Sequence, residues 1–239
     1  MRQVTEAATT DSAWKSLYKV GGGAALIMVA ITLTQVVVFA ISPPPYKGTA
    51  VDWFAFFQKN ALVGLLDFEV LLIVYVGLSA LVSLALFVVL RRTSPTLTAI
   101  FLVLSMIGSA AFISARPAFE MLSLSNQYAA ATTDAQRAAF LAAGEVMVAV
   151  FRGTAYLASY LLGSITGLII GVVMLRSGIF GRAIPSLRMA SSVLDFGLFV
   201  PTVGIFISLL SVVCLLLFNI LVGRRLIQLG SGVSKEDAY

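Results

Sequence analysis

Residues 61–90, ALVGLLDFEVLLIVYVGLSALVSLALFVVL, decide the fold of this chain, because the run from Val70 to Leu90 contains no charged side chain. An α-helix needs about 20 apolar residues to cross a bilayer core of about 30 Å. Four other stretches of the chain are as long and as free of charge. Of the 239 residues, 59% are hydrophobic and 11% are charged, which leaves too little polar surface for a soluble domain. We therefore predict an all-α, polytopic membrane protein that lies in the lipid bilayer of the cell membrane.

The ends of the apolar runs predict a bundle of six transmembrane helices. Charged or turn-forming residues such as Arg91-Arg92 and Arg116-Pro117 separate the runs, and the set 201–204 divides the last run in two. The predicted membrane domain covers 20–223, between an N-terminal segment 1–19 and a tail 224–239. Its spans are expected at about 20–41, 61–90, 96–115, 153–175, 184–200 and 205–223.

Two further patterns set the expected topology. Residues 134–176 contain no proline, so a continuous helix there would be roughly 60 Å long, about twice the thickness of the hydrocarbon core. Helices three and four are therefore expected to extend beyond the outer face. Most of the 16 basic residues fall at the two termini and in the second and fourth loops. By the positive-inside rule, both termini are expected to be cytoplasmic.

Four aromatic residues lie close together in the stretch 52–58, DWFAFFQ, between the first two spans. Aromatic side chains are enriched at the boundary between membrane and water, which favours a short helix that lies flat as an interface anchor. A lid over a cavity is the alternative.

Several classes of function are disfavoured by composition. The chain has no histidine, which is the usual proton shuttle near neutral pH and the commonest metal ligand. The single cysteine, Cys214, lies in an apolar run and cannot form an internal disulfide. The basic residues are scattered at the ends of apolar runs and do not form a nucleic-acid surface. No catalytic residues, metal site or cofactor can be assigned, and an enzyme is disfavoured.

Charged residues gather instead near the predicted outer ends of the spans, where burial costs a few kcal/mol each and marks candidate sites. Asp67 and Glu69 are two positions apart on one predicted helix, so only one of them is expected to point inward. The candidate ligand-binding set is Asp67, Arg116, Glu120, Glu145, Arg152, Tyr156 and Asp195.

Helical spacing predicts how part of this set is arranged. Glu145 and Arg152 would share one face of a continuous helix, which continues into a ladder of small residues and would turn Arg152 into the bundle. Small residues at this spacing allow a second helix to approach closely. The ladder consists of Ser159, Gly163, Gly167 and Gly171. In the predicted fifth span, Arg188, Ser191, Ser192 and Asp195 form a second polar stripe.

The stretch 116–145, RPAFEMLSLSNQYAAATTDAQRAAFLAAGE, together with GLLD at 64–67 and LFVPTVG at 198–204, resembles a prokaryotic family of membrane proteins called domain of unknown function four three eight six. The resemblance extends from about Trp53 to Leu229. It implies a six-span protein of prokaryotic type and no particular activity.

Three functions remain open. The charged set can be salt bridges that fix packing, but its acids outnumber its bases, and an unpaired buried carboxylate protonates or recruits a cation. The favoured hypothesis is a protein that binds, and in a further step transports, a small solute or cation in an outward-facing, acid-lined cavity. The alternatives are a structural or accessory subunit that contacts partner membrane subunits, and an intramembrane enzyme that uses carboxylates alone.

Overall fold

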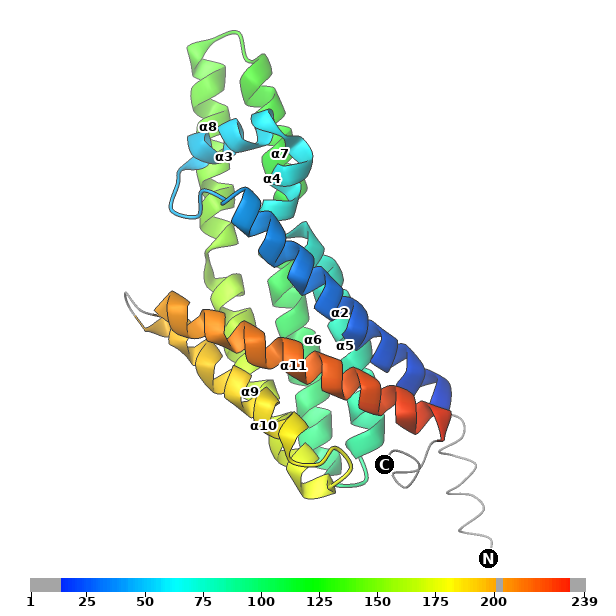
Figure 1. The fold of residues 1–239 in the computed structure, drawn as a ribbon. Helices are drawn as coiled ribbons and strands as arrows, with labels where there is room; N and C mark the ends of the chain where they lie inside the picture. Colours follow the sequence, from blue (N-terminus) through cyan, green and yellow to red (C-terminus); the bar gives the residue numbers. More distant parts are fainter. Residues whose placement is uncertain (1–13, 201–203, 233–239) are drawn as a thin grey trace, which may run out of the picture. The chain divides into compact units, whose positions relative to one another are not determined.

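The computed structural model describes residues 14–200 and 204–232, and every regular element within them is a helix (Figure 1). The turn predicted at 201–204 therefore falls, for 201–203, outside the described residues. The elements in chain order are α2 (Lys15–Ile41), α3 (Ala50–Lys59), α4 (Ala61–Asp67), α5 (Val70–Leu90), α6 (Pro95–Ser114), α7 (Ala118–Ala130), α8 (Asp134–Phe151), α9 (Thr154–Ser177), α10 (Ala183–Asp195), the 3₁₀ helix η1 (Phe196–Phe199) and α11 (Gly204–Ser231).

Five helical segments in the described part of the chain are long and apolar enough to cross a membrane. They are Lys15–Ile41, Val70–Leu90, Pro95–Ala130, Asp134–Ser177 and Leu209–Ser231. This agrees with a multi-pass membrane protein. The region expected to form the fifth of six spans contains only the 13-residue α10 and the 4-residue η1.

The chain divides into two compact units, which are described separately. The first, which we call the aromatic unit, comprises Ile31–Val76 and Ser109–Ser159. The second, which we call the basic unit, comprises Met1–Ala30, Gly77–Gly108 and Tyr160–Tyr239. Helices α2, α5, α6 and α9 contribute residues to both units.

The core of the aromatic unit is built where α3 and α4 pack on the α7–α8 hairpin. Trp53, Phe54 and Phe57 of α3 are between 0% and 2% exposed, and they pack with Phe68, Phe151 and smaller residues of α7 and α8. The interpretation of these aromatics as interface anchors is therefore wrong. Their side chains fill a protein core, because the large apolar area of each ring is removed from solvent by two neighbouring helices.

Small residues allow the close helix packing of the basic unit. The Cα of Gly22 on α2 lies so near α11 that an added Cβ would be 2.7 Å from the Gly223 carbonyl oxygen. An added Cβ on Gly171 of α9 would overlap Cγ of Met189 on α10. Helix α10 also packs along α11. Glycine therefore lets the backbones of these helices approach closely, as in many membrane bundles.

Two helix interruptions separate segments that the sequence pattern treats as continuous. Phe68 and Glu69 divide α4 from α5, and Arg152 and Gly153 divide α8 from α9. No proline stands at either place. The second break disrupts the helical phase on which a common face for Glu145, Arg152 and Ser159 was predicted.

Candidate functional site

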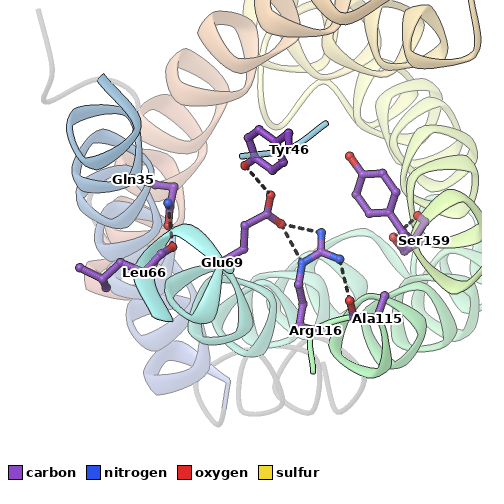
Figure 2. A network of polar contacts seen from close by, with 8 residues as sticks. Gln35, Tyr46, Leu66, Glu69, Ala115, Arg116 and Ser159 are labelled. Atoms are coloured by element: carbon purple, nitrogen blue, oxygen red, sulfur yellow. Dashed lines mark hydrogen bonds and ion pairs between the residues drawn. The ribbon is translucent and has the colours of Figure 1, made fainter. Parts of the chain in front are cut away.

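Two buried charged residues of the aromatic unit, Glu69 and Arg116, form an ion pair (Figure 2). Arg116 donates from Nε to Glu69 Oε2 at 2.7 Å, and its Nη2 lies 2.5 Å from the same oxygen. The side chains of Arg116 and Glu69 are only 1% and 11% exposed. Arg116 Nη1 also donates to the Ala115 carbonyl oxygen at 3.1 Å. A buried pair of this kind is tolerated only when its remaining polar atoms are also bonded.

Tyr46 completes the bonding of the Glu69 carboxylate. Its hydroxyl donates to Glu69 Oε1 at 3.1 Å, so both carboxylate oxygens have a partner (Figure 2). Burial, followed by the negative charge of Glu69, raises the pKa of Tyr46 above its usual value. The raised pKa favours the protonated hydroxyl, which donates the hydrogen bond to Glu69, and the three side chains form one hydrogen-bonded chain.

Aromatic rings surround the Arg116 guanidinium. Its Cζ lies 4.1 Å from the ring centroid of Phe112, 4.8 Å from that of Phe151 and 4.9 Å from that of Tyr156. Each contact is within cation–π range, and such contacts strengthen when water is excluded. The cage therefore supports a charge that would otherwise be costly to bury.

Glu69 has an unusual backbone conformation. Its φ is +65°, the only positive φ of a non-glycine residue in the part of the chain that the structure describes. A side-chain-bearing residue in the left-handed region costs about 1–2 kcal/mol. The conformation lies at the break between α4 and α5 and turns the Glu69 carboxylate toward Arg116. Both Asp67 and Glu69 are consequently buried, so the expectation that only one of them points inward is wrong.

Asp67, the last residue of α4, differs from Glu69 in having no partner. It is 0% exposed, and neither of its carboxylate oxygens has a hydrogen-bond partner. Burial raises its pKa to about 7, because the charged form loses its hydration. A carboxylate in this position is expected to be protonated or to hold a cation.

Two more polar atoms near this end of α4 are buried without partners. Gln35 donates from Nε2 to the Leu66 carbonyl oxygen at 3.0 Å, but its Oε1 has no partner (Figure 2). Nε1 of Trp53 is also unbonded, and the Trp53 ring lies 4.8 Å from that of Phe68. Asp67 stands between Leu66 and Phe68 in the sequence. The three side chains with unpartnered polar atoms, Gln35, Asp67 and Trp53, thus lie at or next to the consecutive residues 66–68.

The other predicted site residues of the aromatic unit do not join this buried group. Glu120, Glu145 and Arg152 are exposed. Glu145 accepts from the Ala50 amide at 2.8 Å, at the first turn of α3, where a negative charge stabilises a helix. Arg152 donates to the Gly48 carbonyl oxygen at 3.0 Å. The prediction that Arg152 points into the bundle is wrong, because the helix ends there and its side chain binds the loop before α3.

Asp195 belongs to the basic unit. It accepts a hydrogen bond from the Ser211 hydroxyl, which joins α10 to α11. Elsewhere on the predicted stripe, Arg188 donates from Nη1 to Ser192 at 3.2 Å and from Nη2 to the Gly163 carbonyl oxygen at 3.1 Å. These bonds tie α9, α10 and α11 together. Of the two pairs considered from the sequence, Arg152–Glu145 does not occur as an ion pair among the described residues, and Arg152 and Asp195 belong to different units.

The remaining small residues of the predicted ladder lie in both units. Ser159 belongs to the aromatic unit and donates to the Tyr156 carbonyl oxygen at 2.6 Å. Gly167 of the basic unit lies against the Arg188 and Ser192 side chains of α10, whereas a Cβ on Gly163 would meet no atom within 4 Å.

A hollow of about 520 Å³ lies between α7 and α8, and Glu120 is its only lining residue from the predicted site. The other lining residues are Phe119, Ser123, Leu124, Gln127, Ala143 and Met147. This lining is mainly apolar and does not match the expected acid-lined cavity. Among the described residues, no three side chains of the His, Cys, Asp or Glu type are grouped to hold a metal ion.

Glu69, Tyr46, Phe112 and Phe151 were absent from the predicted site. Tyr46 follows three prolines in a loop, and nothing in its local sequence indicates a partner 23 residues away. Glu69 was noticed, but a continuous helix places it opposite Asp67. The signal that could have found it is charge, since a second acid beside Asp67 needs a base, and Arg116 and Arg152 were the two bases predicted near it.

Comparisons with protein-family models, with curated proteins and with solved structures find no match to this chain. The resemblance noted in the sequence therefore stays an expectation, and the site is interpreted from its own geometry.

Proposed function

We propose that this chain is a six-span protein of the cell membrane, with both termini cytoplasmic, whose aromatic unit binds a small cation, in the first place a proton, at Asp67. The five long apolar helices would be joined by a short span formed by α10 and η1. Of the 16 basic residues, 11 then lie on the side of the termini. The proposed function is not catalytic, and it narrows the favoured sequence-based hypothesis, the binding of a small solute or cation, to one residue.

The single observation that carries the proposal is the unpaired Asp67 carboxylate. Arg116 is occupied by Glu69, and Arg152 by the Gly48 carbonyl oxygen. The other ionisable groups on the helices packed against α4 are Asp52 and Lys59 on α3, and Glu120 and Tyr128 on α7. Asp52, Lys59 and Glu120 are exposed, and no described group bonds to Asp67. A proton is the smallest ligand that removes the cost of this buried charge.

Infrared spectroscopy of the purified protein in lipid nanodiscs tests this proposal. A protonated carboxylic acid has a carbonyl band separate from that of a carboxylate, and we expect such a band to disappear as the pH rises through about 7. The band should be missing in Asp67→Asn and unchanged in the control Asp134→Asn, whose carboxyl is fully exposed. A band of equal size in wild type and Asp67→Asn would refute the assignment.

A second arm of the experiment separates a proton from a metal cation. Thermal stability is measured at pH 8 with sodium, potassium or calcium as the only added cation. Stabilisation by one of these ions that is lost in Asp67→Asn would identify a metal cation as the ligand. Equal effects of the ions on wild type and Asp67→Asn, combined with the titrating infrared band, would identify the proton.

The proposed topology is tested separately with single cysteines in a Cys214→Ser background. Thr132→Cys, in the α7–α8 loop, should react with a membrane-impermeant maleimide on intact cells. Ser234→Cys, in the tail, should react only after the membrane is permeabilised. Labelling of both residues from outside would refute the six-span arrangement and leave the Asp67 experiment unaffected.

A structural or accessory subunit is the second candidate, and an exposed apolar surface favours it. Phe119 on α7 and Val146 on α8 are 62% and 57% exposed. Copurification of a stoichiometric membrane partner, lost in the double variant Phe119→Ser/Val146→Ser, would favour this function over cation binding.

A further inference from the structure

A second hollow, of about 440 Å³, lies in the basic unit where the ends of several helices meet. It is lined by residues at the start of α2, after the end of α5, in the α9–α10 loop and near the end of α11. These segments are distant in the sequence but belong to the same compact unit. The hollow is therefore formed by the fold and is not a local groove of one helix.

Three cationic side chains line this hollow. Lys15 is the first residue of α2, Arg92 follows α5, and Arg225 lies on α11. Arg225 is held in place because its Nε donates to the Ile179 carbonyl oxygen at 3.0 Å. A planar guanidinium donates through several N–H groups and suits the oxygens of phosphate, while the Lys15 ammonium adds a mobile point charge.

The described charges that line the hollow have one sign. In the described part of the basic unit, Asp195 is the only acidic residue, and it bonds to Ser211. The basic residues of the same part are Lys15, Lys19, Arg91, Arg92, Arg176, Arg182, Arg188, Arg224 and Arg225. Arg91 lies 5.7 Å from the Trp14 ring, so this end also has an aromatic residue of the kind found at membrane boundaries. An anion placed here would meet several positive charges and no described carboxylate of the lining.

Apolar side chains form the rest of the wall. Val88 and Val89 at the end of α5 and Leu229 on α11 line the hollow beside the three cations. A free inorganic phosphate would leave these side chains without an apolar partner. A phosphate that is attached to a glycerol and acyl chains would contact both the cations and the apolar wall.

We propose that this hollow binds the phosphate headgroup of an anionic phospholipid, with Lys15, Arg92 and Arg225 as its ligands. Basic pockets between transmembrane helices on the cytoplasmic side bind such headgroups in other membrane proteins. The choice of leaflet rests on the topology proposed above. Binding itself uses neither that topology nor Asp67, so the two proposals can fail independently.

The test uses the full-length protein, purified in a neutral detergent and titrated with phosphatidylglycerol. Native mass spectrometry counts retained lipids, and a thermal-shift assay reports stabilisation. We expect wild type to retain phosphatidylglycerol in preference to phosphatidylcholine. Lys15→Gln/Arg92→Gln should weaken phosphatidylglycerol binding about 30-fold, since each basic residue near an anionic lipid contributes about 1 kcal/mol. This variant leaves the Arg225–Ile179 bond in place, so it is expected to fold.

The matched control is Arg176→Gln, which removes an exposed arginine of the same unit that does not line the hollow. Retention of phosphatidylglycerol by this control at the wild-type level supports a localised site. Equal weakening by Arg176→Gln and by the double variant would show a diffuse charge effect and overturn the proposal. Equal retention of phosphatidylcholine, or stabilisation by inorganic phosphate without phosphatidylglycerol binding, would also overturn it.

Discussion

Helices pack against each other in different ways in the aromatic unit and in the basic unit. In the aromatic unit, Trp53, Phe54 and Phe57 fill the space between α3 and the α7–α8 hairpin. In the basic unit, glycines such as Gly22 and Gly171 bring helix backbones close together. Aromatic rings stabilise helix packing by burying a large apolar area between the helices, whereas glycines stabilise it by allowing close contact of the helix backbones.

The two units also differ in charge. The described residues of the aromatic unit include six acids and five bases, while those of the basic unit include nine bases and one acid. The near balance in the first unit allows pairs such as Glu69–Arg116 and leaves Asp67 unpaired. The excess among the described residues of the second unit favours an anionic ligand. Together, the two proposals place a cation site in the aromatic unit and an anion site in the basic unit. Four predictions about stability test the contrast between the units, in order of decreasing expected effect.

Removal of one partner of the buried ion pair should have the largest effect. Arg116→Met leaves Glu69 charged and unpaired in a nearly water-free site, and we expect the free energy of unfolding to fall by about 3–5 kcal/mol. The double variant Glu69→Gln/Arg116→Met should recover most of that loss, since no uncompensated charge remains. Denaturation in detergent, followed by circular dichroism, measures both. Equal losses in the single and double variants would show that the aromatic cage, and not the charge, needs Arg116.

The second effect is a dependence of stability on pH. Burial raises the pKa of Asp67 to about 7 in the folded state, from about 4 in the unfolded chain. The folded state therefore binds the proton more tightly. The resulting stabilisation is complete below about pH 4, is lost as the pH rises to about 7, and amounts to as much as about 4 kcal/mol.

Asp67→Asn mimics the protonated form, so its stability should stay level over this pH range where that of wild type falls. Melting temperatures between pH 4 and 8 provide the measurement. A parallel decline in the two proteins would mean that other groups dominate the titration.

The third effect compares glycines from the two units. A Cβ on Gly144 of α8 would lie 2.7 Å from Cζ of Phe54 and 2.9 Å from Cβ of Ala50, neither of which can move freely. We expect Gly144→Ala to cost about 1–3 kcal/mol. Gly171→Ala should cost less, because the nearest atom belongs to the flexible Met189 side chain.

Gly163→Ala is the control for both, since its Cβ would meet no atom within 4 Å. It should be neutral or slightly stabilising, as expected for alanine in a helix. The order of the three melting temperatures is the measurement. If Gly171→Ala were the most damaging, the distinction between a rigid aromatic core and an adaptable glycine contact would fail.

The smallest effect is expected at the start of α8. The Thr133 hydroxyl accepts a hydrogen bond from the backbone amide of Gln136 at 3.2 Å and caps the helix. Thr133→Ala should cost about 1 kcal/mol and speed amide hydrogen exchange in the first turn of α8. Thr96→Ala, in the first turn of α6 in the basic unit, is the comparison and should change neither the stability nor the hydrogen exchange of α8. Unchanged exchange in Thr133→Ala would show that the hairpin tip does not depend on its cap.

The sequence predicted an all-helical, multi-pass protein because charge-free runs such as 70–90 have only one stable arrangement in lipid. It also indicated that Asp67 and Arg116 are special, because charge near a span is costly. The breaks at 68–69 and 152–153 could not be predicted, since helical periodicity assumes that a helix continues where no proline stops it. The errors for Glu69 and Arg152 both follow from that assumption.

The aromatic residues of α3 could not be assigned for a different reason. Burial in a protein core and insertion at a membrane boundary need the same amphipathic pattern, and only the packing of α3 on α7 and α8 decides between them. Gly144 could have indicated this packing, since a glycine inside a helix often marks the place where a large side chain of a neighbouring helix approaches.

The chain of bonds from Tyr46 through Glu69 to Arg116 has a consequence for local opening. It joins the loop before α3, the α4–α5 break and the α6–α7 junction, three places where the helices are interrupted. None of these three places can fray without breaking a bond to the same carboxylate. They should therefore behave as one cooperative foldon, which opens as a whole or not at all.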